Sequence, residues 1–532
     1  MALIERLEGQ SVASVLRTRA TTDPGRAFLH HAGEAVTYAE VESSSESLAA
    51  GLAQLGVEPG DRVALILPPC PEFVVGLFAA AKLGAVIVPL DPRLTPTELQ
   101  YTLRHSEAVA AVTAESAYGV DFLQLFEDLL VGLPALQYLV TVGEEDLWYD
   151  DRIFQYEDLV SAGAGRDFQG SEVDPSDDAF ALVYTSGTTG KPKGVELSHR
   201  NLLFAAGGTA AALERSADDR ITGVSALFHV FGLGPGILST LMAGASLLLE
   251  DGADPGRRLE RVESAEATVH YGVPTTFLEE LREQEREPRD LRSLRVALVA
   301  GAPTSDELVE RIRSELAGTV LVAYSVTEAS STVCVSRPDH TAEKRAFTVG
   351  VPLEGTEVRI LERDGVELPV ESVGEIAVRG PGVMLGYYRQ PTDTRAAVDP
   401  EGFLHTGDLG MVDEEGFVHL VGRKKDVIIR SGFTIHPREV ESRLDAHPAV
   451  QESAVVGVSH PILGEAVCAC VVPIEGAIVT DVELETWCRD TLAAAKVPDR
   501  VRFFDAFPRT GTGTIRRVEL ARLVQAEVDP AI

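Results

Sequence analysis

Short apolar runs alternate with helix-like stretches in the first part of the chain. Arg62 to Leu67 and Ala85 to Leu90 have the pattern of strands, and Phe73 to Leu83 between them has that of a helix. A second helix is expected after Thr95, because a hydroxyl at the N-cap, Pro at the first helical position and Glu98 form a capping box. Another apolar run follows that helix. This β-α-β-α-β order predicts an open parallel sheet covered by helices.

The same alternation of strand-like and helix-like segments occurs again near the middle of the chain. Leu294 to Val299 and Val320 to Ala323 are strand-like, and Thr304 to Leu316 is helix-like, with Thr304 and Glu307 as an expected capping box. A second α/β unit is therefore expected. Ligands of such sheets bind beyond the carboxyl ends of the strands.

The pattern of apolar and polar residues changes twice more toward the C-terminus. After about residue 350, short alternating runs with closely spaced Gly and Pro predict a β-rich subdomain. Near Arg423 a basic cluster begins a stretch of mixed helix and strand patterns, which is the size of a small separate domain. We therefore predict an α/β protein with a large N-terminal domain, residues 1–422, and a small mobile α+β domain, residues 423–532.

The amino-acid composition excludes some classes of protein and argues against some binding partners. The 532 residues include 47 basic and 82 acidic side chains, for a net charge of −35, and 45% of the chain is hydrophobic. The hydrophobic share excludes a disordered chain, and the acidity argues against binding to nucleic acid or to an anionic membrane surface. Lysine is rare within this balance. The lysines are Lys82, Lys191, Lys193, Lys344, Lys424, Lys425 and Lys496.

Cysteine usage and the N-terminal sequence bear on location. Five scattered Cys residues favour reduced thiols over a disulfide framework, and no zinc site is expected. The first ten residues have no basic region before an apolar run, so we expect no signal peptide. The most apolar window, 73–90, is interrupted by Lys82 and two Gly, so no integral membrane segment is expected. We expect a cytoplasmic protein.

The segment 184–194, YTSGTTGKPKG, has the composition of a phosphate-binding loop. It follows an apolar strand and contains four hydroxyl residues, three Gly and two Lys. Backbone N–H groups and ammonium groups in such a loop form a concavity for anions. It is not a Walker loop, because Pro192 follows Lys191 where that motif has Ser or Thr. The strand-like GVELSH after it indicates that the loop joins two strands.

Seven segments in order resemble the signatures of the adenylate-forming superfamily, which includes acyl-CoA synthetases, peptide-synthetase adenylation domains and luciferases. They are YTSGTTGKPKGVELSHRN from 184, ALFHVFGLG from 226, AYSVTE from 323, GEIAVRGPGVMLGYY from 374, HTGDLG from 405, GRKKDVIIRSGFTIHPREVE from 422 and PRTGTGTIRR from 508. The resemblance implies an ATP-dependent acyl-CoA ligase. Such an enzyme activates a carboxylate as an acyl-adenylate, releases pyrophosphate and transfers the acyl group to coenzyme A.

The resemblance also assigns roles to individual residues. Thr327 is expected to touch the α-phosphate, and Glu328 to hold Mg²⁺, which prefers hard oxygen ligands. His229 is expected at the wall of the acyl pocket and Lys425 at the pivot of the small domain. The residues expected to contact the nucleotide or coenzyme A are Thr185, Ser186, Gly187, Thr188, Thr189, Gly190, Lys191, Lys193, Gly301, Ala302, Pro303, Tyr324, Asp408, Arg423 and Gly432.

Thr514 departs from the family pattern. The last motif of the superfamily normally has a lysine here, which bridges the carboxylate and the α-phosphate during adenylation. A Thr side chain is shorter and uncharged, so a weakened or rearranged adenylation step is expected, with Arg509 or Arg516 as substitutes for the missing charge. Ser325, after the stacking Tyr324, replaces a family Gly.

The sequence leaves three functions open. The first is the acyl-CoA ligase using a small-molecule carboxylate, ATP, Mg²⁺ and coenzyme A. The second is an adenylate-forming enzyme with a carrier-protein or amine acceptor, and the third is a catalytically impaired nucleotide- or acyl-binding protein. The mostly apolar or small residues around Phe228 to Gly234, Tyr271 to Thr276 and Ala300 to Pro303 favour an aliphatic or aromatic acid over a dicarboxylate. Whether the chain forms a homodimer stays open.

Overall fold

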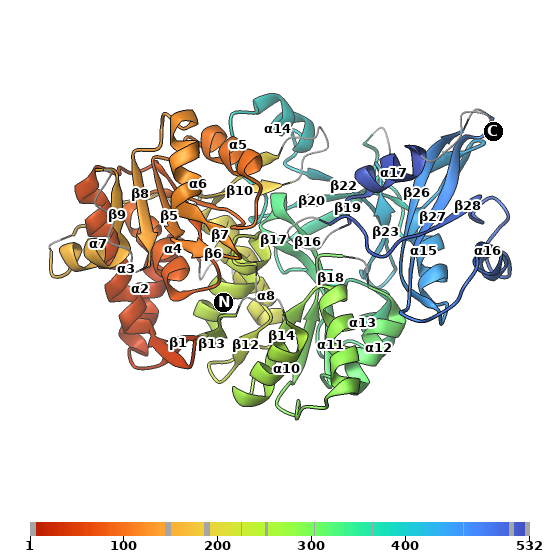
Figure 1. Ribbon diagram of the computed structural model, residues 1–532, viewed down its shortest axis with the longest axis horizontal. Coiled ribbons are helices and arrows are strands. Elements are labelled where there is room, and N and C mark those ends of the chain that lie inside the picture. The colour runs from red at the N-terminus through yellow and green to blue at the C-terminus, as the bar shows by residue number, and fades with distance from the viewer. Residues whose placement is uncertain are drawn as a thin grey trace.

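The computed structural model describes residues 7–143, 151–166, 168–185, 192–224, 226–250, 254–302, 304–362, 365–460, 462–509 and 515–526. Two large sheets, a four-stranded sheet and a five-stranded sheet follow one another across the molecule (Figure 1). The C-terminal domain lies at one end and the first α/β unit at the other. This is the predicted α/β architecture, with a large N-terminal and a small C-terminal part.

The first large sheet has eight strands and a parallel centre, as the β-α-β pattern predicts. Across the sheet the strands are β21 (Gly386–Tyr387), β11 (Lys193–Ser198), β10 (Ala179–Thr185), β4 (Val86–Pro89), β3 (Arg62–Ile66), β5 (Ala110–Ala114), β8 (Tyr138–Val142) and β9 (Ile153–Gln155). Its helices are α3 (Tyr38–Leu55), α4 (Pro71–Leu83), α5 (Pro96–Ser106), α6 (Phe122–Leu129) and α7 (Tyr156–Gly163). The apolar window is thus the helix α4 followed by the strand β4, as expected.

The second large sheet has nine strands, and β1 together with β12 to β16 forms its parallel part. In order the strands are β18 (Val351–Pro352), β17 (Ser331–Val335), β16 (Thr319–Val326), β15 (Val296–Val299), β14 (Val269–Gly272), β12 (Arg220–Thr222), β13 (Ser246–Leu248), β1 (Ala27–His31) and β2 (Glu34–Thr37). Further helices are α2 (Val12–Thr22), α8 (His199–Ala212), α9 (Ser239–Ala243), α10 (Pro255–Ser264), α11 (Pro274–Arg286), α12 (Asp306–Glu315) and α13 (Ala342–Phe347). One buried core cluster continues through both large sheets.

One of the two expected capping boxes is confirmed and the other is wrong. Thr95 and Glu98 cap α5 reciprocally, each side chain accepting the other residue's backbone N–H. At α12 the N-cap is Ser305, whose hydroxyl accepts from the Leu308 N–H at 3.3 Å, and not Thr304. The two neighbouring hydroxyls are equivalent in the sequence pattern, but Ser305 is the extended residue directly before the first helical residue, Asp306.

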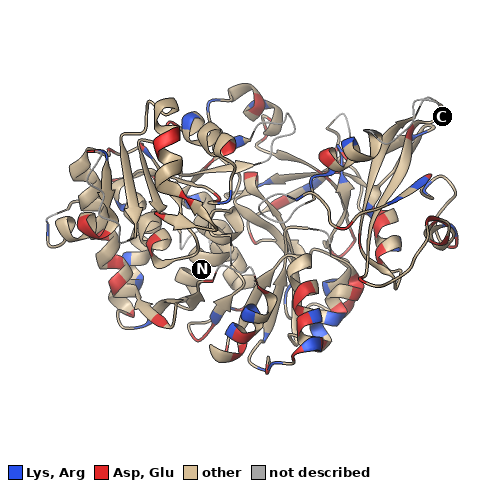
Figure 2. Cartoon of the chain, viewed as in Figure 1, with Lys and Arg blue, Asp and Glu red and all other residues tan. Residues whose placement is uncertain are grey.

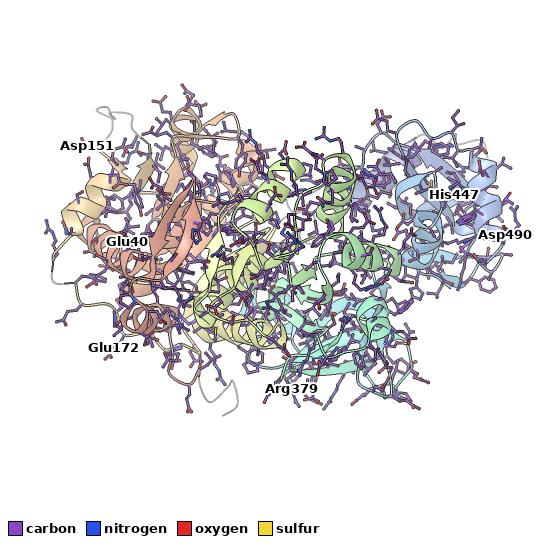
Figure 3. All side chains as sticks on the ribbon, turned by 90° about the horizontal axis from the view of Figure 1, so that it is seen from below. Glu40, Asp151, Glu172, Arg379, His447 and Asp490 are labelled. Carbon is purple, nitrogen blue, oxygen red and sulfur yellow. The ribbon has the colours of Figure 1, made fainter. Side chains whose placement is uncertain are left out.

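The β-rich segment after residue 350 and the C-terminal domain form the remaining sheets. The four-stranded sheet contains β19 (Glu357–Leu361), β20 (Gly374–Arg379), β22 (Leu404–Val412) and β23 (Val418–Arg423), with α14 (Pro391–Ala397) beside it. The C-terminal sheet contains β24 (Ile428–Arg430), β25 (Phe433–Ile435), β26 (Val450–His460), β27 (Gly464–Pro473) and β28 (Arg500–Phe503). Separate apolar clusters pack α15 (Pro437–Asp445) and α16 (Asp481–Arg489), and α17 (Arg517–Ala526), against that sheet. In Figure 3, Arg379 marks the four-stranded sheet, and His447 and Asp490 mark the C-terminal domain. The exact domain boundary stays a prediction.

Charged residues are distributed over both domains. Figure 2 shows acidic and basic residues close together on α11 and α12, where Arg311 pairs with Glu285 and Glu315. All five cysteines are free and buried, which confirms the expected thiols. Among the described residues, no helix has both the length and the hydropathy needed to cross a membrane.

His199 at the start of α8 makes stability depend on pH. Its Nδ1 accepts from the Val12 N–H at 3.3 Å, its ring stacks on Phe180, and burial lowers its pKa from 6.5 to about 4. The pKa of His199 is lower in the folded protein than in the unfolded chain. The stabilisation that depends on a neutral imidazole is therefore complete above pH 6.5, and up to about 3 kcal/mol of it is lost as the pH falls toward 4. Urea unfolding should show that the stability difference between wild type and His199→Phe shrinks from pH 7 to pH 4.5. A difference that stays constant with pH would contradict this.

Candidate active site

The predicted phosphate loop joins two antiparallel strands, as expected. β10 ends at Thr185, which pairs with Lys193 at the start of β11. The Tyr101 hydroxyl of α5 donates to the Pro192 carbonyl at 3.2 Å and so supports the end of the loop. The remaining predicted loop residues lie outside the described residues. They are Ser186, Gly187, Thr188, Thr189, Gly190 and Lys191.

The Lys193 ammonium is held by two side chains from a distant part of the chain. Its Nζ lies 2.7 Å from Asp393 Oδ2 in α14 and 4.7 Å from the centre of the Tyr387 ring. β21, which contains Tyr387, pairs with β11 next to the loop. The side chain is therefore oriented before any ligand binds. Neither partner was predicted, although Tyr387 lies in the quoted GYY segment.

Tyr324, Asp408 and Arg423 form one connected group. The Tyr324 hydroxyl donates to Asp408 Oδ2 at 2.7 Å, and Arg423 Nε lies 2.9 Å from Asp408 Oδ1. Asp408 and Arg423 are paired residues of the adjacent strands β22 and β23. Burial and the Asp408 carboxylate raise the pKa of the Tyr324 phenol well above its ordinary value, so it remains a donor. The structure thus brings together three residues that the sequence assigned to the adenosine site.

Glu375 holds this group in place and was not predicted. It is a buried residue of β20, and its Oε1 accepts from the N–H of Gly407, the residue before Asp408 in β22, at 3.1 Å. Its Oε2 pairs with Lys424 at 2.9 Å. One carboxylate therefore connects the HTGD segment of β22 to the basic cluster. The quoted motif contains Glu375, but a strand pattern does not show which backbone it contacts.

Thr327 and Glu328 begin a 3₁₀ turn, Thr327–Ala329, directly after β16. Glu328 Oε1 accepts from the Tyr387 hydroxyl at 2.8 Å, and the Glu328 carbonyl accepts from the Met384 N–H at 2.9 Å. No cluster of three metal-ligating side chains occurs in the described part of the chain. A single half-buried carboxylate fits Mg²⁺, which commonly uses one or two carboxylates together with substrate phosphates.

Three segments assigned to the acyl pocket adjoin one another. The Phe231 and Tyr271 ring centres lie 5.2 Å apart, and a Cβ placed on Gly301 would lie 3.2 Å from Val273. Ala302 is exposed, and Pro303 is outside the described residues. Residues Gly232–Leu238 form a π-helix, a rare element that is frequent at functional sites.

His229 is neutral at physiological pH. Burial lowers the pKa of its imidazole to about 4, and its Nδ1 accepts from the Phe231 N–H at 3.3 Å. A neutral imidazole with one nitrogen accepting from the backbone suits a pocket wall. Its expected position beside the acyl site is consistent with the contact between Phe231 and Tyr271.

The backbone is strained directly after Glu328. Ser330 and Ser331 have φ values of +63° and +98°, which are uncommon for residues other than Gly. Ser331 is fully buried, and its hydroxyl makes no hydrogen bond with a described residue. A Cβ placed on Gly234 would lie 3.9 Å from the Ser331 Cβ, so Ser331 adjoins the acyl segments. The Ser325 hydroxyl likewise has no partner in the described part of the chain.

The C-terminal domain presents the remaining predicted residues. Lys425 is exposed and makes no ion pair with a described residue. Ser431 and Gly432, with φ values of +51° and +84°, form the tight turn between β24 and β25. A Cβ on Gly432 would have no neighbour within 4 Å.

Thr514 lies outside the described residues, whereas Arg509, Arg516 and Arg517 are described. Arg509 pairs with Glu452, and Arg517 pairs with Glu441, so both guanidinium groups are used within the C-terminal domain. Arg516 extends toward the large domain, where its Nη2 lies 3.9 Å from Glu98 Oε1 at the start of α5. Arg516 Nε also donates to the Arg509 carbonyl at 3.0 Å, so this guanidinium group too is held within the C-terminal domain.

The connected Tyr324–Asp408–Arg423 group, the Glu328 carboxylate and the β10–β11 hairpin all lie in the segments that resemble the adenylate-forming superfamily. The chain belongs to the AMP-binding enzyme family, whose profile matches residues 16–388, and the profile of the AMP-binding enzyme C-terminal domain matches residues 439–514. The chain is an AMP-forming acid–thiol ligase.

Known proteins similar to this chain are ligases of this type. A feruloyl-CoA synthase from an Amycolatopsis species is 38% identical over 97% of this chain and 99% of that protein. A long-chain-fatty-acid–CoA ligase from Bacillus subtilis is 31% identical over 98% of this chain and 96% of that protein. The structure of ATP-bound MatB from Rhodopseudomonas palustris aligns with a TM-score of 0.88 at 30% identity, covering 98% of this chain and 100% of that one.

Proposed function

We propose that the enzyme activates an aromatic monocarboxylic acid with ATP and Mg²⁺ and transfers the acyl group to coenzyme A. The observation that carries the acid class is the pairing of the Phe231 and Tyr271 rings among the acyl segments. The described residues of these segments include no charged side chain, so they offer no counterion for a second carboxylate. Two arginines adjoin these segments: Arg93, 5.8 Å from the Phe228 ring, is paired with Asp91, and Arg215 donates to the Tyr271 hydroxyl.

Two observations favour a ring with a polar substituent. The Ser331 hydroxyl, beside Gly234, is a buried donor that a phenolic or methoxy oxygen would satisfy. Feruloyl-CoA synthases are among the relatives at 38% identity. Ferulate carries both kinds of oxygen on an aromatic ring.

The adenylation step joins an anion to a polyanion, so positioning and charge neutralisation supply most of the catalysis. Asp408 and Arg423 would hold the ribose, Tyr324 would pack on the adenine, and Thr327 would touch the α-phosphate. Glu328 would hold Mg²⁺, which supplies charge neutralisation on the phosphates when bound. Lys193 and the loop before it would hold the β- and γ-phosphates.

A panel of acids tests the function. Ferulate, benzoate, octanoate, palmitate and malonate are each incubated with ATP, MgCl₂ and coenzyme A, and AMP, pyrophosphate and the acyl-CoA are measured. We expect an acyl-CoA with the hydroxylated aromatic acid at the highest kcat/KM and none with malonate. Pyrophosphate release without an acyl-CoA product would instead support a carrier-protein or amine acceptor. No pyrophosphate release with any acid would support a binding protein.

Gly432 tests the second half-reaction, because the space next to it is expected to admit the pantetheine arm. Gly432→Ala should lower acyl-CoA formation from supplied acyl-adenylate at least about tenfold, while ATP–pyrophosphate exchange is retained. Gly476→Ala is the matched control, since Gly476 has φ +79° and equally open surroundings in the same domain. Equal losses in both variants would indicate backbone strain and not a coenzyme A contact.

Thr514 is proposed to weaken adenylation, because no lysine stands at this position of the last motif. Arg516 is the proposed partial substitute, since it extends from the C-terminal domain toward α5. Location in the cytoplasm and a domain rotation about Lys425 are likewise proposals.

A further inference from the structure

Tyr387 connects the proposed metal ligand to the phosphate loop. Its hydroxyl donates to Glu328 Oε1 at 2.8 Å, and its ring lies 4.7 Å from Lys193 Nζ. Glu328 and Tyr387 are 59 residues apart in the chain. A single side chain therefore contacts both a proposed metal ligand and a proposed phosphate ligand.

Tyr387 is itself fixed at three points. Its N–H donates to the Thr394 hydroxyl at 2.9 Å, and its backbone pairs with Val195 of β11. The Lys193 ammonium over its ring is in turn held by Asp393 at 2.7 Å. Because Asp393 and Thr394 both belong to α14, this helix sets the position of the phenol and of the cation together.

Only one of the two carboxylate oxygens of Glu328 accepts a hydrogen bond from a described residue. The Tyr387 hydroxyl occupies Oε1, whereas Oε2 makes no hydrogen bond with a described residue. The Met384 N–H holds the Glu328 carbonyl at 2.9 Å, so both the backbone and the carboxylate are fixed from residues 384–387.

We infer that Tyr387 is a positioning residue that holds the Glu328 carboxylate for Mg²⁺ and aligns it with the phosphates bound near Lys193. The inference rests on the proposed function, because it takes Glu328 as the ligand of the metal that accompanies ATP. Hydrogen-bond partners of metal ligands orient those ligands and raise their affinity for the metal. Removing the Tyr387 hydroxyl should therefore reduce the gain in ATP affinity that Mg²⁺ provides, and should leave the contacts of the adenosine part of ATP unchanged.

The test is calorimetric and needs neither acid nor coenzyme A. ATP is titrated into wild type, Tyr387→Phe and Tyr388→Phe, first in EDTA and then in MgCl₂. Tyr388 is the matched control, since its ring packs near His105, 5.8 Å between centres, and not on Glu328. In Tyr387→Phe we expect the gain in ATP affinity from Mg²⁺ to fall about tenfold or more, with the affinity in EDTA unchanged. Tyr388→Phe should match wild type.

A second readout follows the metal directly. Mn²⁺ binding to the enzyme–ATP complex, measured by electron paramagnetic resonance, should weaken by the same factor in Tyr387→Phe. In a Glu328→Gln background the Tyr387→Phe change should have no further effect on either measurement. Thermal melts of all variants report folding.

The outcomes separate the inference from the proposed function. A Tyr387→Phe protein with an unchanged Mg²⁺ gain overturns the inference and leaves the ligase function intact. Equal loss of ATP affinity in EDTA and in MgCl₂ also overturns it, because this would show a structural support of the loop. A wild type that binds no ATP in either condition overturns the proposed function itself.

Discussion

Thr514→Lys is expected to raise ATP–pyrophosphate exchange about 10²- to 10³-fold. The reason is electrostatic, because a cation placed where charge develops between carboxylate and α-phosphate lowers the barrier by about 3 to 4 kcal/mol. Thioester formation from supplied acyl-adenylate should change little, since that half-reaction has no need of this cation. Exchange of labelled pyrophosphate into ATP in the presence of the best acid measures the first effect.

The control for Thr514→Lys is a lysine two residues earlier, Thr512→Lys. It adds the same charge to the same segment but not at the motif position. An equal rise in both variants would point to general attraction of ATP to a less acidic protein. If exchange in the natural chain is already fast and Thr514→Lys leaves it unchanged, Arg516 or another group replaces the lysine, and the idea of a weakened adenylation step is wrong.

Asp408→Asn should raise the KM for ATP about 10- to 100-fold, with a smaller effect on kcat. The carboxylate is 6% exposed, accepts from Tyr324 and pairs with Arg423. The substitution removes a charged acceptor for the proposed ribose contact and leaves the Arg423 guanidinium without its partner. Hydrogen bonds to charged groups contribute about 1.5 to 3 kcal/mol each, which sets the size of the effect. Steady-state exchange kinetics over a range of ATP concentrations measure it.

Asp413→Asn controls for damage to the sheet in that experiment. Asp413 follows the same strand, pairs with Lys344 at 2.7 Å and lies 3.1 Å from the His419 Nε2. Its loss should lower the melting temperature and leave the KM for ATP unchanged. If both variants raise the KM equally, the effect of Asp408 reflects the integrity of β22 and β23 and not contact with the nucleotide.

Local patterns predicted the elements of this fold well. The first α/β unit, the hairpin around the loop and the β-rich segment all follow from apolar periodicity and turn residues, which act over short distances in the chain. The N-cap of α12 was misplaced by one residue, because Thr304 and Ser305 have the same capping chemistry. The site was predicted through motif resemblance, and the structure assembles Tyr324, Asp408 and Arg423 as expected.

The supporting contacts of the site were not predictable in the same way. Glu375 contacts the Gly407 backbone 32 residues away, and Asp393 of α14 contacts Lys193 of β11. Such contacts depend on strand order and on side-chain direction, which no local pattern specifies. No role was assigned to Tyr387 from the sequence, because only the fold brings its hydroxyl to Glu328, 59 residues away.

The contact between Arg516 and Glu98 bears on the proposed rotation of the C-terminal domain. The two groups are 3.9 Å apart, and the side chains are 46% and 37% exposed. An exposed pair of this kind contributes less than about 1 kcal/mol and is screened by salt. It therefore shifts the ratio between orientations by no more than about fivefold. A rotation about Lys425 would lose little when it separates them, and ionic strength would move the balance between the two half-reactions.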